Sequence, residues 1–395
     1  MVLARHIDIP RVISEKAFLF GLVIGNTAKS DVENSLNELE RLTESAGAWV
    51  TGKMIQKLHV PSKTHYLGEG KLEELVEQTH TTGSNVVIFD DELSPLQQRN
   101  LEDALKVKVL DRVALILDIF AKRARTREGQ LQVALAQHQY LYPRLAGQWS
   151  HLERLGGGIG TRGPGESQLE TDRRIIQKKI GRLKDQIEQV RKQRNLHRQK
   201  RKKSGVSVVA LVGYTNAGKS TLLNTLSKSN VVADDNLFVT LDPVTRRLFL
   251  PDTTSILLTD TVGFIRKLPP AIVAAFRATL EELDEADLLL HVVDVSSPDA
   301  AEQCQAVEGI INDLKLSEKP RITVLNKIDR LLDRTKVWTE EEALEFLSGQ
   351  GLPENEEAVM ISAGKKWGLP ELLEKISSVI REKASSTAAG ENGAL

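Results

Sequence analysis

The segment VSVVALVGYTNAGKSTLLNTL, Val206–Leu226, decides the fold of this chain. Residues 206–212 are apolar apart from Ser207 and typical of a buried strand, and the pattern GxxxxGKS follows from Gly213 to Ser220. The glycines allow backbone N–H groups to turn toward a phosphate, and the helix that follows adds the positive end of its dipole. A strand, a glycine loop and a helix in this order predict a phosphate-binding loop on an α/β sheet, with Lys219 on the β- and γ-phosphates and Ser220 on Mg²⁺.

A second motif predicts that the base is guanine. The stretch TVLNKID, 323–329, reads as a strand that ends in Asn326, Lys327 and Asp329. A carboxylate at Asp329 can accept hydrogen bonds from N1–H and the 2-amino group of guanine, whereas adenine has neither donor at those places. We expect Asn326 to tie the phosphate loop to the base and the Lys327 stem to cover the ring.

Three further segments complete a nucleotide site in the expected order. SILLTDTVGF, 255–264, is an apolar strand that ends at Asp260, a predicted Mg²⁺ ligand through water, and it places the N–H of Gly263 near a γ-phosphate. LFVTLDPVTR, 237–246, contains Thr240 as the second hydroxyl for Mg²⁺. VMISAGKKWGLPELL, 359–373, brings the backbone of Ser362–Gly364 toward the guanine O6.

These motifs define the predicted site residues. Lys219, Thr240 and Gly263 are the predicted catalytic residues, and Ser220, Thr240 and Asp260 are the predicted metal ligands. The predicted nucleotide-binding residues are Gly213, Tyr214, Thr215, Asn216, Ala217, Gly218, Lys219, Ser220, Thr221, Phe238, Val239, Thr240, Leu241, Asp242, Asp260, Thr261, Val262, Gly263, Asn326, Lys327, Ile328, Asp329, Ser362, Ala363 and Gly364.

One expected catalytic side chain is missing. Many small GTPases place a glutamine that orients water directly after the glycine of the second switch, but here that residue is Phe264. An aromatic ring cannot orient water by hydrogen bonding. We therefore expect slow intrinsic hydrolysis, or a group supplied by another part of the chain or by a partner.

The first hundred residues predict a separate open α/β sheet. Four apolar strands, near 17–25, 48–58, 85–91 and 106–111, alternate with helical segments near 31–47, 70–83 and 94–105. No catalytic pair and no phosphate loop occurs among them. A binding or scaffolding role is the favoured interpretation.

Two long helical segments separate this sheet from the phosphate loop. Residues 112–142 predict one helix that ends at Pro143. A second helix carries Ile176, Ile180, Leu183, Ile187 and Val190 at the spacing of a helix-pair seam. Between 173 and 203 the second helix has fourteen Lys or Arg and two acidic residues. A solvated helix face is the alternative, but this imbalance favours a polyanion, contacted through phosphates because no aromatic residue is present.

The glycine-rich segment GGGIGTRGPGESQLETDRR, 156–174, lies between these two helices. Together with GYTNAGKST, FVTLDPVTR, DTVGF and NKID, in this order, it resembles the HflX family of translation-associated GTPases, from about residue 19 to about residue 380. The resemblance implies an N-terminal α/β domain, a helical hairpin and a Ras-like GTPase domain. It also implies Mg²⁺-dependent GTP hydrolysis, binding to the large ribosomal subunit and its rRNA, and rescue or splitting of stalled ribosomes.

The resemblance also suggests that the loop 156–165 probes rRNA near the peptidyl-transferase region, with Arg162 on phosphate; a flexible hinge is the competing interpretation.

The predicted segments are 1–112, 113–203, 204–384 and a flexible tail, 385–395. The alternative function is a GTP-dependent signalling switch or RNA-binding module without splitting activity. A single cysteine excludes a disulfide framework. A cytoplasmic monomer without a membrane span is expected, with a chloroplast or mitochondrion as the alternative location.

Overall fold

The computed structural model describes residues 15–154, 164–203, 206–227, 237–238, 240–267, 282–333, 335–349 and 358–392, with some helix ends described by their backbone alone. The chain divides into two compact units, Met1–Ile119 with Pro143–Leu169, and Phe120–Tyr142 with Glu170–Leu395. This division cuts the segment 113–203, so the predicted domain boundaries stay a prediction. Among the described helices, none is long and apolar enough to cross a membrane.

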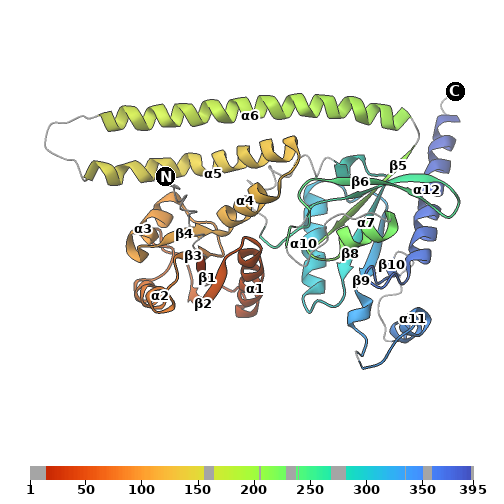
Figure 1. Ribbon diagram of the computed structural model, residues 1–395, viewed down its shortest axis with the longest axis horizontal. Helices are drawn as coiled ribbons and strands as arrows, with labels where there is room; N and C mark the ends of the chain where they lie inside the picture. The colour runs from red at the N-terminus through yellow and green to blue at the C-terminus, as the bar shows by residue number, and fades with distance from the viewer. Residues whose placement is uncertain are drawn as a thin grey trace, which may run out of the picture. The chain divides into compact units, whose positions relative to one another are not determined.

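The first unit contains an open sheet of four parallel strands in the order β2-β1-β3-β4, which confirms the predicted N-terminal sheet (Figure 1). Phe20 and Phe89 of this sheet pack with Leu75 and Leu101 of two helices in one hydrophobic cluster. The opposite face is covered by α1, because a Cβ on Gly21 of β1 would lie 2.9 Å from the Val32 side chain. The elements are β1 (Lys16–Ile24), α1 (Lys29–Ser45), β2 (Trp49–Leu58), α2 (Glu69–Thr82), β3 (Val86–Phe89), α3 (Pro95–Leu105), β4 (Lys108–Asp111) and the start of α4 (Arg112–Arg123).

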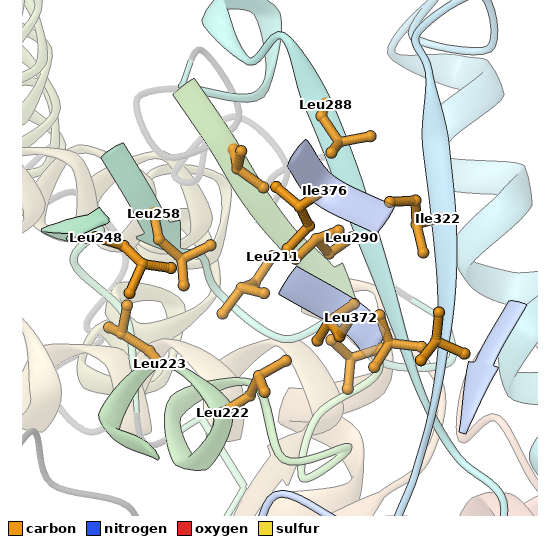
Figure 2. Close-up of a cluster of buried hydrophobic side chains, with 14 of the residues drawn as sticks. Leu211, Leu222, Leu223, Leu248, Leu258, Leu288, Leu290, Ile322, Leu372 and Ile376 are labelled. Atoms are coloured by element: carbon orange, nitrogen blue, oxygen red, sulfur yellow. The ribbon is translucent and has the colours of Figure 1, made fainter. Parts of the chain in front are cut away.

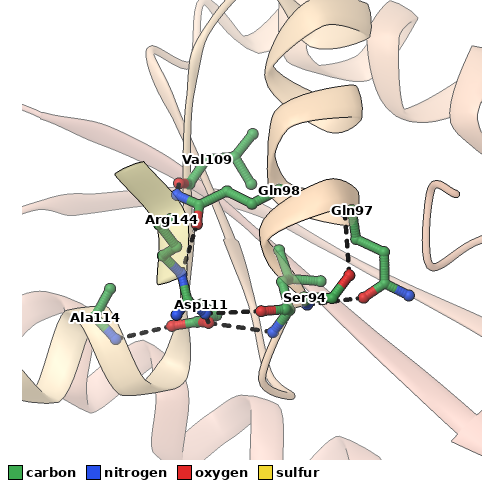
Figure 3. A network of polar contacts seen from close by, with 8 residues as sticks. Ser94, Gln97, Gln98, Val109, Asp111, Ala114 and Arg144 are labelled. Carbon is green, nitrogen blue, oxygen red and sulfur yellow. Dashed lines mark hydrogen bonds and ion pairs between the residues drawn. The ribbon is translucent and has the colours of Figure 1, made fainter. Parts of the chain in front are cut away.

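A buried carboxylate fastens the end of β4 to its surroundings (Figure 3). Asp111 accepts hydrogen bonds from the backbone N–H of Leu93 at 3.1 Å and of Ala114 at 2.8 Å, and from Arg144 at 3.2 Å. Arg144 also donates to Gln98 at 3.0 Å. Because Asp111 is fully buried, these donors stabilise a charge that would otherwise be costly to desolvate.

The long helix predicted for residues 112–142 is wrong in two places. It breaks between α4 and α5 (Arg127–Arg154), and α5 continues through Pro143. The break has a local cause, because the Thr126 hydroxyl accepts the Gly129 N–H at 3.0 Å and so acts as an N-cap for α5. Pro143 has no N–H for a helical hydrogen bond, yet α5 continues past it to Arg154.

The second unit contains a six-stranded sheet in the order β10-β9-β8-β5-β7-β6. Five strands are parallel, as predicted, and β6 is an antiparallel edge strand that the sequence analysis did not predict. The strands are β5 (Ser207–Gly213), β6 (Val244–Phe249), β7 (Ser255–Asp260), β8 (Leu288–Asp294), β9 (Arg321–Asn326) and β10 (Ala358–Met360). The helical elements are α6 (Pro164–Lys203), α7 (Lys219–Ser227), α10 (Ala300–Asp313), η1 (Ile328–Arg330), α11 (Glu340–Ser348) and α12 (Leu369–Asn392).

Helices cover both faces of this second sheet. Leu222 of α7 and Leu372 and Ile376 of α12 pack with Leu211 and Leu290 of the strands in one buried cluster (Figure 2). On the other face, Glu308 of α10 lies 3.6 Å from the ring of His291 in β8. The two-sided cover explains why the central strands are apolar on both faces. The predicted tail at 385–395 differs from the structure, because α12 continues to Asn392.

Within the second unit, α5 and α6 run antiparallel, because Glu128 pairs with Arg194 at 2.8 Å and His138, further along α5, lies near Lys179, earlier in α6. The predicted seam is confirmed, because Ile176, Ile180, Leu183, Ile187 and Val190 are partly buried, whereas most other described side chains between 170 and 196 are exposed. Residues 156–163 of the predicted rRNA-probing loop, Arg162 included, lie outside the described residues, and α6 begins at Pro164, within the predicted loop.

Candidate nucleotide-binding site

The predicted phosphate loop lies at the carboxyl end of β5, the central strand of the second sheet. Two of its glycines have no room for a side chain. A Cβ on Gly213 would lie 2.3 Å from the Val292 carbonyl oxygen, and a Cβ on Gly218 would lie 2.2 Å from the Asn326 amide nitrogen. Both also have positive φ angles, 149° and 97°. The loop therefore brings its bare backbone to the strand ends, where α/β sheets bind ligands.

Lys219 lies buried beneath this loop. Its ammonium donates to the carbonyl oxygens of Gly213 at 3.1 Å and Tyr214 at 2.7 Å. Burial lowers the pKa of Lys219 to about 8, while nearby Asp260 opposes that change and Lys327 adds to it. A buried ammonium with a lowered pKa is suited to bind an anion, since a phosphate supplies the missing counter-charge.

The three predicted metal ligands lie in direct contact. The hydroxyl oxygens of Ser220 and Thr240 are 2.8 Å apart, and each donates to Asp260 Oδ2, at 2.6 Å and 2.9 Å. Two neighbouring ligands of an octahedral Mg²⁺ lie about 3 Å apart, given metal–oxygen distances of about 2.1 Å. The spacing of the two hydroxyls therefore fits a magnesium ion.

The charge of Asp260 also fits a cation. Asp260 is fully buried, and its Oδ1 has no hydrogen-bond partner among the described residues. Burial raises the pKa of Asp260, and Lys219 and the two hydroxyls act in the opposite direction. A bound cation would compensate this carboxylate. Elsewhere in the described part of the chain, no group of three or more His, Cys, Asp or Glu side chains could hold a metal.

Asn326 connects the loops that would surround the base. Its side-chain amide donates to the Ala217 carbonyl at 2.8 Å, and its Oδ1 accepts the Ala363 N–H at 3.0 Å. Lys327 donates to the Asn216 carbonyl at 2.7 Å and pairs with Asp294 at 2.8 Å. These bonds hold the phosphate loop, the end of β9 and the loop after β10 together.

Asp329 is oriented at the mouth of this arrangement. The Ser362 hydroxyl donates to its Oδ1 at 2.6 Å, and its Oδ2 has no partner among the described residues. The carboxylate is partly buried. An oriented acceptor of this kind can receive the two donors on the Watson–Crick edge of guanine.

Several predicted nucleotide-binding residues face the protein interior instead. Phe238, Val262 and Ile328 are almost fully buried, and Ile328 packs in a cluster with Leu332 and Leu347. Only their backbone atoms remain available to a nucleotide. Val239 lies outside the described residues.

Phe264 is held by contacts that its place in the sequence does not indicate. Its side chain is buried, and its backbone pairs with the phosphate loop, because Thr215 donates to the Phe264 carbonyl at 2.8 Å and Phe264 donates to the Gly213 carbonyl at 3.1 Å. Next to it, a Cβ on Gly263 would lie 2.7 Å from Thr215 Cα. Phe264 thus fixes the segment after Asp260 against the loop, a role that only the fold reveals.

Comparison with known proteins places these elements in one family. Residues 33–121 match a family model described as GTP-binding GTPase N-terminal, residues 123–201 one described as GTP-binding GTPase Middle Region, and residues 208–327 one described as 50S ribosome-binding GTPase. A protein named GTPase HflX from Caldanaerobacter subterraneus is 51% identical over 92% of this chain and 80% of its own length. GTPase HflX from Escherichia coli is 49% identical over 78% of this chain and 72% of its own.

The chain belongs to the GTPase HflX family. It is a GTP hydrolase with a P-loop GTPase domain, as the sequence analysis predicted. Among solved structures, a GTP-binding protein from Sulfolobus solfataricus in complex with GDP is 25% identical, covers 93% of this chain and 99% of its own, and has a TM-score of 0.45.

The lowered pKa of Lys219 predicts proton uptake on GTP binding. With a pKa of about 8 in the free protein, Lys219 is half neutral at pH 8, and the bound phosphates favour its charged form. Binding at pH 8 should take up about half a proton per nucleotide. Calorimetry at pH 8 in two buffers of different ionisation enthalpy measures this number, and a value near zero would show that Lys219 is already fully charged.

The geometry of Asp329 predicts a change of base specificity. Asp329→Asn replaces one acceptor with a donor, so GTP affinity should fall by about tenfold or more, and affinity for xanthosine triphosphate should rise. Fluorescence titration with both nucleotides measures the change. Asp333→Asn removes an exposed carboxylate nearby and should change neither affinity; unchanged GTP affinity in Asp329→Asn would contradict the assignment.

Proposed function

We propose that this GTPase binds the large ribosomal subunit and rescues stalled ribosomes by dissociating them. The family model matched by residues 208–327 is described as a 50S ribosome-binding GTPase, which supports this proposal. The observation on this chain that carries it is the charge of α6. Arg174, Lys178, Lys179, Arg182, Lys184 and Lys192 are exposed and have no acidic partner within 4.0 Å among the described side chains.

Such a row of unpaired cations is suited to the phosphates of rRNA. Each lysine or arginine that neutralises a phosphate releases counterions, which makes binding favourable and sensitive to salt. The seam residues occupy the apolar side of α6, and the six basic side chains named above are exposed outside that seam. The helix α6 therefore presents a long basic surface that a polyanion can contact while the helix stays folded.

For hydrolysis we propose the roles that the geometry supports. Lys219 and the loop 213–218 bind and orient the phosphates, Ser220, Thr240 and Asp260 hold Mg²⁺, and Asp329 selects guanine. When bound, Mg²⁺ neutralises charge that develops on the β- and γ-phosphate oxygens. Because Phe264 is buried and cannot orient water, we propose a slow intrinsic rate that the ribosome increases. A cytoplasmic monomer is the state proposed for this activity.

Sedimentation with isolated large ribosomal subunits tests the binding. With a non-hydrolysable GTP analogue, the protein should co-sediment, and log K should fall with log salt by about 0.7–0.9 for each phosphate contact. Reversing Lys178, Lys179, Arg182 and Lys184 to Glu should flatten that slope. Exchanging Lys and Arg at the same four positions keeps the charge and should leave it unchanged. An unaltered slope in the reversed variant would place the RNA contact elsewhere.

Light scattering of stalled ribosomes tests the splitting activity separately. We propose that residues 156–165 act as an rRNA probe, so replacing them with a Gly/Ser stretch of equal length should leave subunit binding near normal and abolish splitting. A hinge would tolerate this replacement, since Gly/Ser chains bend easily. Binding without any splitting by the unaltered protein would favour the alternative, a GTP-dependent switch or RNA-binding module.

A further inference from the structure

Two contacts hold the described part of the segment 237–242 on either side of Thr240. The first is aromatic. Phe238 meets Phe120 of α4 edge to face, with ring centroids 4.8 Å apart and an interplanar angle of 83°. Both rings are almost fully buried. This contact joins residue 238 to the last turn of α4, within the second unit.

The second contact is polar and lies two residues after Thr240. One carboxylate oxygen of Asp242, Oδ2, accepts the backbone N–H groups of Arg125 and Thr126, each at 2.8 Å. The other oxygen, Oδ1, accepts the Thr126 hydroxyl. Asp242 is thus bound by three donors from the turn between α4 and α5.

The sequence of that turn is suited to a carboxylate. The break at 124–126 leaves backbone N–H groups without helical partners, and the start of α5 favours negative charge. Gly129, in the first turn of α5, has no space for a side chain, because its Cβ would lie 2.3 Å from Asp242 Oδ1. Pro243 follows Asp242 and restricts its backbone to extended conformations.

Thr240 lies between these two contacts, and its side chain contacts the predicted metal ligands. Its hydroxyl lies 2.8 Å from Ser220 and donates to Asp260 at 2.9 Å. Two residues of chain span at most about 7 Å, so fixing residues 238 and 242 leaves Thr240 little freedom. The ordering cost of bringing a free loop to the metal ligands is thereby reduced before GTP binds.

We propose that Asp242 and Thr126 form a positioning pair that holds Thr240 at the metal site. The proposal rests on the metal role proposed for Thr240 above. Asp242 then affects nucleotide binding only through the position of Thr240, since its own carboxylate is bound to the turn at 125–126. By thermodynamic reciprocity, a nucleotide that needs Thr240 in place also favours the closed contact between Asp242 and the turn.

The pair predicts a difference between GTP and GDP. Thr240 is required when a γ-phosphate and Mg²⁺ are present, whereas GDP is held by the loop 213–220 and the base contacts. Asp242→Ala should weaken binding of a non-hydrolysable GTP analogue with Mg²⁺ by about tenfold, the loss expected for hydrogen bonds to a charged group. GDP affinity should stay within about twofold, and single-turnover hydrolysis should fall.

Thr126 variants separate positioning from simple folding. Thr126→Val removes the hydroxyl but keeps the two backbone N–H bonds to Asp242, so it should reproduce part of the loss for the analogue. Thr126→Ser keeps the hydroxyl, both for Asp242 and for the N-cap of α5, and should restore the affinity. Asp242→Ala leaves the N-cap of α5 intact, because Thr126 still accepts the Gly129 N–H. The double variant should lose little more analogue affinity than Asp242→Ala alone, since the Thr126 hydroxyl acts on Thr240 only through the Asp242 carboxylate. Asp313→Ala, which removes an exposed carboxylate on α10, is the matched control.

Three results would overturn the positioning pair: equal losses for GDP and the analogue, unchanged analogue affinity in both single variants, or additive losses in the double variant. Thr240→Ala distinguishes this failure from failure of the proposed metal role. If Thr240→Ala weakens Mg²⁺-dependent analogue binding and the Asp242 and Thr126 variants do not, only the positioning pair is wrong. If Thr240→Ala itself has no effect, the metal role is wrong as well.

Discussion

Two buried opposite charges, Lys219 and Asp260, set the electrostatics on which the nucleotide site depends. Burial lowers the pKa of Lys219 and raises the pKa of Asp260, so each side chain is held in surroundings that disfavour its charge. Their mutual attraction only partly offsets the cost of removing both from water. Phosphate oxygens beside Lys219 and a cation beside Asp260 would compensate both charges together. A ligand that supplies both counter-charges would therefore be favoured at this site.

The fold supports this arrangement by bringing distant segments to one edge of a sheet. β5 lies in the centre of the order β10-β9-β8-β5-β7-β6, with β7 on one side and β8 on the other. The carboxyl ends of β5, β7 and β9 carry the phosphate loop, Asp260 and Asn326 respectively. Parallel strands place such ends side by side, so the spacing of the side chains follows from backbone geometry. The hydrogen bonds of Asn326 then fix the loops to one another.

The phosphate loop and the N-terminal sheet could be predicted from the sequence because their signals are local. A strand, a glycine loop and a helix lie within twenty-one residues, and the four N-terminal strands alternate with helices in simple periods. The missed features depend on partners far along the chain. Thr126 and Gly129 read as ordinary residues of one long helix, and the carboxylate that occupies their turn lies more than a hundred residues later. Likewise, Phe264 reads as a missing glutamine, whereas its backbone pairing with Gly213 and Thr215 appears only in the folded sheet.

The first turn of α5 is the place where these long-range contacts converge. Thr126 and Gly129 meet Asp242, while Glu128, between them, pairs with Arg194 of α6 at 2.8 Å. Arg194 also lies 3.7 Å from Glu282 and is mostly buried among these acids. Removing one partner of a largely buried ion pair is costly, so this contact stabilises the packing of the start of α5 on α6. The contacts from Asp242 through Thr126 and Glu128 to Arg194 connect the segment around Thr240 with α6. With the metal role proposed for Thr240, these contacts link the proposed metal site to the basic helix α6.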